Sequence, residues 1–222
     1  MRPASSRTHR KRPADGVLTE LDAPTAALVR LAAAIAASGE AAMRQRFVAA
    51  MEALVPNAWV DELVIQSYLF SGFPRALNAA REWRRIMPIA SPSTDDPADP
   101  ARAEEWLARG EATCHAVYDG MYEKLRENVY RLHPALDAVM VMDGYGKVLG
   151  RPGLDLARRE LCVVAACAAT LQDRQLHSHL HGALNVGVSS AVLVATLEAL
   201  IPELGADRVG SIRLLLARVI GK

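Results

Sequence analysis

Residues 145–187 read YGKVLGRPGLDLARRELCVVAACAATLQDRQLHSHLHGALNVG, and nearly all the side chains suited to chemistry lie in this stretch. A turn is expected at Arg151-Pro152-Gly153, because proline presets φ and glycine accepts backbone angles that other residues avoid. The small-residue run from Leu154 to Leu171 predicts one helix. Gln172 to Val186 predicts a second helix, which ends at Gly187. A hairpin of two helices is therefore expected here.

The composition of the whole chain indicates an all-α protein. Of the 222 residues, 51% are apolar but only 5% are aromatic, and alanine supplies much of the apolar share. Alanine favours helices, whereas strands are enriched in aromatic and β-branched residues. A chain of this length can bury a substantial core, as one large domain or two small ones.

Charge and cysteine content limit the classes of function. The net charge is +1, so no strong field attracts nucleic acid to the body of the protein. Three cysteines at no paired spacing argue against a disulfide framework and indicate a reducing, cytoplasmic environment. No run reaches the roughly 18 apolar residues of a membrane span. Neither a nucleic-acid partner nor a membrane partner is expected.

The N-terminal residues 1–16, MRPASSRTHRKRPADG, are basic and contain no apolar core of a secretory signal. We expect them to form a disordered basic tail. An arm that binds nucleic acid or a protein partner is the alternative, and the lack of an aromatic residue among the basic ones makes it the weaker one.

Proline and glycine divide the rest of the chain into helical segments. Residues 88–100, PIASPSTDDPADP, form the one clear linker. The helices predicted before the linker cover residues 24–38, 40–55, 58–70 and 75–86. Those predicted after it, besides the central hairpin, cover residues 101–109, 112–132, 135–145, 190–201 and 206–220.

Two segments of the chain, one near each end, resemble each other in sequence. A shift of 133 residues places Ala27–Ala79 against Glu160–Ile212 without a gap. Identical residues are few, but the order of helices, breaks and one glycine coincides, which predicts an old duplication of a four-helix unit. We therefore predict two diverged copies packed as an internal pseudo-dimer. Residues 17–87 would form the first copy, residues 101–144 the connecting helices, and residues 145–222 the second copy with the candidate site.

Glu160 and His179 are the best candidates for chemistry. They lie on consecutive predicted helices, so a hairpin could bring a carboxylate against an imidazole, with Glu160 fixing the tautomer of His179 for general acid–base catalysis. The first copy has Ala27 and Arg46 at the corresponding positions and looks structural. The alternative is a surface ion pair for Glu160 and a buried, hydrogen-bonded histidine that has no catalytic role.

Other polar residues of the stretch have weaker signals. His177 and His181, four apart, have the spacing of a two-histidine metal site, but no HExxH glutamate accompanies them, so a metal is not expected. An oligomer contact or a polar pocket wall is the alternative. Arg151 and Arg174 could hold a substrate carboxylate, although most such arginines cap helices or pair at the surface. The remaining candidates are the cysteines, which we expect to pack in the core: Cys114, Cys162 and Cys167.

Several motifs resemble the carboxymuconolactone decarboxylase family. They are YGKVLGRPGL from Tyr145, REL from Arg159, QLHSH from Gln175 and GALNVG from Gly182. In the first copy GFPRALNA, from Gly72, resembles the closing segment of the family. The resemblance implies the all-α helical unit of the alkylhydroperoxidase D-like proteins.

The branch of the family follows from two absent cysteines. The peroxidase branch uses a glutamate, a Cys-x-x-Cys pair and a histidine. The resemblance places the glutamate at Glu160 and the histidine at His179. Gln172 and Gln175 occupy the positions of the two cysteines. Without a dithiol, peroxidase chemistry has no nucleophile. The resemblance therefore implies the decarboxylase-like branch, which uses no cofactor.

In that branch the substrate would be a small carboxylated lactone or a related carbonyl compound. His179 would donate a proton, oriented by Glu160, while Arg151 or Arg174 would hold the carboxylate and His177 and His181 would line the pocket. Single-unit relatives assemble as trimers of dimers, which implies a homotrimer of fused pseudo-dimers. A non-catalytic oligomeric or ligand-binding protein is the alternative, and a thiol peroxidase is a more distant one.

Overall fold

The computed structural model describes residues 18–90, 95 and 99–221. The predicted basic tail at residues 1–16 and part of the predicted linker lie outside these residues. Within them the chain is helical apart from turns, caps and one isolated bridge between Leu18 and Val188. The predicted all-α class is therefore confirmed. None of the described helices is both long and apolar enough to cross a membrane.

The helices before the linker and those after residue 155 follow the same order. The first set is α1 (Ala23–Ala37), α2 (Glu40–Glu52), α3 (Asn57–Ser71) and α4 (Phe73–Ile86). The second set is α8 (Leu156–Ala169), α9 (Asp173–Asn185), α10 (Ser190–Ala199), α11 (Ile201–Leu204) and α12 (Ala206–Val219). The starts of α8, α9, α10 and α12 each lie 133 residues after those of α1, α2, α3 and α4.

Matching local signals produce the matching helix starts. The side chain of Asp22 accepts a hydrogen bond from the Thr25 amide at the start of α1, and Asp155 accepts one from the Arg158 amide at the start of α8. Gly72 before α4 has φ 82° and Gly205 before α12 has φ 81°. These two positions favour glycine, because a side chain at positive φ is strained.

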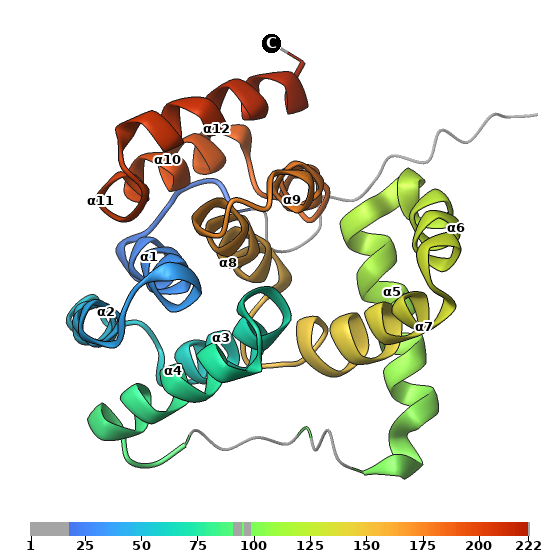
Figure 1. Ribbon diagram of the computed structural model, residues 1–222, viewed down its shortest axis with the longest axis horizontal. Coiled ribbons are helices and arrows are strands. Elements are labelled where there is room, and N and C mark those ends of the chain that lie inside the picture. The colour runs from blue at the N-terminus through green and yellow to red at the C-terminus, as the bar shows by residue number, and fades with distance from the viewer. Residues whose placement is uncertain (1–17, 91–94, 96–98, 222) are drawn as a thin grey trace, which may run out of the picture.

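The core centres on the contact between α1 and α8. These helices lie side by side, with α2, α3 and α4 below them and α10 to α12 above them in the view of Figure 1. Both are alanine-rich and buried along most of their length, so small side chains let the two backbones approach closely. The buried side chains that fill this layer include Leu28, Leu31, Ile35, Leu161 and Val164.

The connecting region differs from the prediction. The predicted helix break near Gly110 is wrong: α5 (Ala103–Tyr118) runs through it, and the chain turns at Asp119–Met121 instead. A Cβ at Gly110 would overlap the Val141 carbonyl, so this glycine permits close packing and does not end a helix. The turn begins at Asp119, whose φ of 47° is strained for a residue with a side chain.

After the turn come α6 (Tyr122–Leu132), α7 (Pro134–Val139) and a π-helix, η3 (Met140–Leu149). The π-helix packs along α5, where a Cβ at Gly146 would overlap the Trp106 carbonyl. The predicted boundary between connecting helices and second copy, at residues 144 and 145, falls inside η3. The division of the chain into units stays a prediction.

Candidate active site

The structure brings Glu160 and His179 together. Glu160 lies on α8 and His179 on α9, and Nδ1 of His179 is 2.8 Å from Oε2 of Glu160. Both residues are buried, with exposed fractions of 0% and 4%. Gly182, one turn after His179, makes room for the carboxylate, because a Cβ there would lie 2.7 Å from Oε2. The hairpin predicted from the sequence thus forms the expected pair.

This pair has the geometry of an oriented imidazole. An ionised carboxylate only accepts hydrogen bonds, so Nδ1 of His179 carries the hydrogen and Nε2 is the nitrogen left for other chemistry. Oε1 of Glu160 is buried and has no hydrogen-bond partner in the described part of the chain. Such an atom is costly to leave unpaired, and it marks a place where a further polar group would be stabilising.

Aromatic rings enclose the imidazole. The ring of Phe70 on α3 packs edge-on against His179 at 5.6 Å between centroids, and the ring of Tyr118 on α5 lies at 6.3 Å. Burial raises the pKa of Tyr118 to about 12, and a hydrogen bond with Tyr145 partly opposes this rise. Burial also raises the pKa of Tyr145 well above its usual value. Both phenols are therefore neutral near pH 7.

Next to this cluster lies a cavity of about 660 Å³. Its walls come from the end of α5, the turn after it, α6 and the exposed face of α9. Tyr118 lines the cavity and also contacts the ring of His179, so it stands between the cavity and the buried pair. Glu160 and His179 are not among the lining residues. Besides Tyr118, the polar side chains of the walls are Asp119, Lys124, Asn128, His177, Ser178, His181 and Asn185.

His177 and His181 share one face of α9, as their spacing predicts. Their ring centroids are 4.9 Å apart, both residues are exposed, and both line the cavity. Burial and the neighbouring His177 lower the pKa of His181, so the His181 imidazole is largely neutral near pH 7. Among the described residues no group of three side chains of the metal-binding types could hold an ion.

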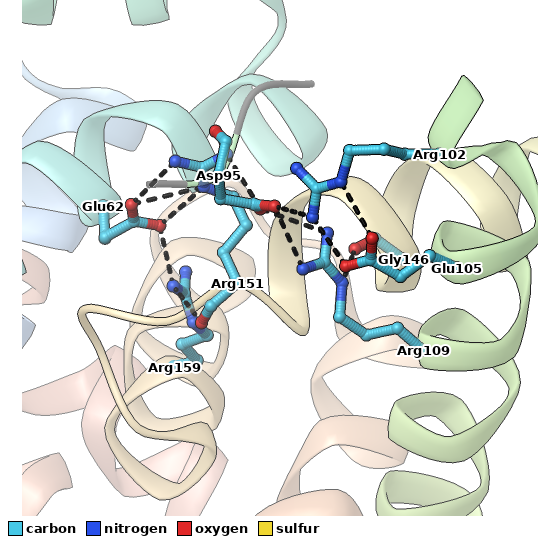
Figure 2. A network of polar contacts seen from close by, with 8 residues as sticks. All are labelled: Glu62, Asp95, Arg102, Glu105, Arg109, Gly146, Arg151 and Arg159. Carbon is cyan, nitrogen blue, oxygen red and sulfur yellow. Dashed lines mark hydrogen bonds and ion pairs between the residues drawn. The ribbon is translucent and has the colours of Figure 1, made fainter. Parts of the chain in front are cut away.

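Arg151 is engaged elsewhere. Its Nε lies 3.0 Å from Oε2 of Glu62, and its Nη1 lies 3.2 Å from Oδ2 of Asp95. Arg159 donates to the same Glu62 carboxylate at 2.8 Å (Figure 2). All three interactions are buried, so this guanidinium already holds two carboxylates. Its predicted contact with a substrate carboxylate stays a prediction, and this arrangement does not favour it. Arg174 is exposed on α9.

Asp95 extends this network toward α5. Arg102 and Arg109 bind its carboxylate at 2.7 Å and 3.1 Å, and Nε of Arg109 also donates to the Gly146 carbonyl (Figure 2). Burial alone would raise the pKa of Asp95, but the hydrogen bonds from Arg109 and Arg102 lower it below its ordinary value. The network thus fastens this point of the linker to α5 and η3, the helices that carry Tyr118 and Tyr145.

The cysteines are free and buried, as expected for core residues. Burial raises the pKa of Cys114, of Cys162 and of Cys167 to about 12. A thiol with such a pKa is almost entirely protonated near pH 7 and is a poor nucleophile.

Tyr118, Lys124 and Asn128 were not expected at the site. They lie on α5 and α6, outside the motifs that carry the family resemblance, and no local pattern marks them. The one sequence signal for this region is the Asp119-Gly120 dipeptide, which favours a turn and therefore predicts that a helix ends at Tyr118.

The fold and the pair define an all-α protein in which a helical hairpin holds a buried glutamate and histidine. Residues 134–216 match the model of the carboxymuconolactone decarboxylase family. The matched segment contains both Glu160 and His179, so this part of the chain is similar to the family. No curated protein matches the chain.

Proposed function

We propose that the protein is a cofactor-independent decarboxylase, a lyase that acts on a small carboxylated lactone or a related carbonyl compound. The observation that carries the proposal is the buried Glu160–His179 hydrogen bond next to Tyr118, which lines a cavity of about 660 Å³. The volume suits a small molecule. Lys124 is the cationic side chain of the lining, which also contains the carboxylate of Asp119.

The proposed reaction breaks the bond between the substrate carbon and its carboxylate. The electron pair stays on the substrate as an enolate, carbon dioxide leaves, and a proton is then added to carbon. Nε2 of His179, whose ring Glu160 orients through Nδ1, takes up a proton from solvent and delivers it to the substrate carbon. Tyr118 lies between His179 and the cavity. Lys124, on α6, favours the anionic substrate electrostatically.

A non-catalytic, ligand-binding protein is the second candidate. The observation in its favour is that Glu160 and His179 do not themselves line the cavity. In that case the buried pair would stabilise the hairpin and the cavity would bind a ligand without changing it. The thiol peroxidase alternative has less support, because the three cysteines are buried and protonated.

The proposal includes an internal pseudo-dimer. Its support is a set of contacts that repeat after 133 residues. Arg75 donates to the carbonyl of Ile35, and Arg208 donates to that of Ala168. Thr25 and Arg158, 133 residues apart, contact each other, as residues on a pseudo-two-fold axis do.

We also propose that the fused chain forms a homotrimer in the cytoplasm. Apolar side chains on α6 and α7 are more than half exposed and would be covered by another copy. They are Tyr130, Leu132, Leu136 and Val139. Three free, buried thiols fit a reducing compartment. Light scattering of the purified protein tests the assembly: a single monomer mass at micromolar concentration would contradict it.

The test of activity is metal-free decarboxylation of γ-carboxymuconolactone, followed by ultraviolet absorbance, with His179→Ala as the variant. Turnover by the wild type and a loss of about 10²–10⁴-fold in the variant are expected. Equal turnover by both would remove His179 from the mechanism. Binding without turnover in the wild type would favour the ligand-binding alternative.

A further inference from the structure

The first helical set contains a second, smaller cavity at the place that corresponds to the Glu160–His179 pair. Arg46 on α2 occupies the position of His179, and Ala27 on α1 occupies that of Glu160, each 133 residues earlier. The cavity has a volume of about 250 Å³, and its walls are five alanines and two arginines, Arg30 and Arg46. Ala27 is one of these alanines, so the cavity lies at the position that the Glu160 carboxylate occupies in the second helical set.

The two arginines meet at one acidic residue. Nε of Arg30 lies 3.0 Å and 3.2 Å from the two carboxylate oxygens of Glu203, and Nε of Arg46 lies 2.6 Å from Oε1. Glu203 belongs to α11, which lies next to α1 (Figure 1). Its side chain is 5% exposed, whereas those of Arg30 and Arg46 are 31% and 29% exposed. Glu203 thus orders the two guanidinium groups at the edge of the cavity.

Both arginines use Nε for this contact. Among the described residues, the Nη atoms of Arg30 and Arg46 have no hydrogen-bond acceptor. The cluster holds two positive charges and one negative charge, so an excess of one positive charge faces a cavity whose other walls are methyl groups. A guanidinium group beside low-dielectric walls binds an anion more strongly than one in open water.

We propose that this cavity is a binding site for a small anion, a carboxylate or a phosphate. The anion lies beside Arg46, in the position that corresponds to that of the Glu160 carboxylate beside His179. The Nη groups of Arg30 and Arg46 donate hydrogen bonds to its oxygens. The site is separate from the cavity beside Tyr118, and it does not depend on the proposed decarboxylase activity.

The experiment is calorimetric titration of the full chain with inorganic phosphate and, separately, with acetate. The anion that binds more tightly shows whether the site prefers a phosphate or a carboxylate. A single site per chain with a Kd of about 1 mM or tighter is expected at low salt, and it weakens as chloride is added. The deciding variant is Ala27→Glu, which introduces a carboxylate of the protein itself at the proposed position of the anion. It is expected to weaken binding at least about tenfold. The matched control is Arg81→Ala, which removes an exposed cation on α4 and is expected to bind like the wild type.

Three outcomes would overturn the site. They are no binding of either anion up to about 10 mM, unchanged binding in Ala27→Glu, and equal weakening in Arg81→Ala. Side-chain nuclear magnetic resonance on the wild type provides a second measurement in case Ala27→Glu does not fold. The Nε–H signals of Arg30 and Arg46 are expected to shift on titration with the anion, and the absence of any shift during saturation would place the anion elsewhere.

Discussion

Arg151 and Glu62 form a buried ion pair, with Nε of the arginine 3.0 Å from Oε2 of the glutamate, although 89 residues separate them along the chain. The pair connects α3 of the first helical set to the turn before α8. The same carboxylate accepts a hydrogen bond from Arg159, so two guanidinium groups share it (Figure 2). This arrangement lets the turn hold α8, and with it Glu160, in a fixed position relative to α3.

Replacing Arg151 with alanine is expected to lower the free energy of unfolding by about 3–5 kcal/mol, because Glu62 would lose one of its two cationic partners inside the protein. Urea denaturation followed by circular dichroism measures this change. Arg174→Ala is the control, and because this arginine is exposed its effect is expected to stay within about 0.5 kcal/mol. An Arg151→Ala protein of normal stability with a raised KM for a carboxylated lactone would instead assign Arg151 to substrate binding.

The carboxylate of Asp95 makes stability depend on pH. Its pKa in the folded protein lies below the ordinary 3.8, because hydrogen bonds from Arg109 and Arg102 outweigh the opposite effect of burial. The stabilisation is therefore complete above the ordinary pKa and is lost as the pH falls below it toward the lowered value. The difference in stability between wild type and Asp95→Asn is expected to be largest near pH 7 and to shrink below about pH 4. A difference that stays constant between these pH values would contradict the assignment.

The contact between α5 and η3 depends on glycine. A Cβ at Gly146 would overlap the Trp106 carbonyl, so Gly146→Ala is expected to destabilise the protein by at least about 2 kcal/mol. Gly144, in the same π-helix, offers a matched control, because the nearest atom to an added Cβ, the Val139 oxygen, is 3.8 Å away. Thermal unfolding of the two variants compares them directly, and equal midpoints would show that the close approach is not required.

The helix order and the Glu160–His179 pair could be predicted from the sequence, because caps, breaks and a helical hairpin are local signals. The role of Gly110 could not, since a glycine that ends a helix and one that admits a neighbouring backbone look the same in a sequence. Tyr118 was missed for a different reason. Its place beside His179 results from the packing of α5 on α9, and α5 lies outside the matched family segment.

The state of the cysteines distinguishes the proposed decarboxylase from the thiol peroxidase alternative. Because burial raises the pKa of Cys114, Cys162 and Cys167 to about 12, the native thiols are expected not to react with Ellman's reagent near pH 8, whereas all three should react after unfolding. Peroxide added to the native protein should likewise leave the thiol count unchanged. A thiol that reacts rapidly in the native state and is lost together with peroxide would revive the peroxidase alternative, because that chemistry needs an accessible thiolate and a second cysteine within disulfide reach.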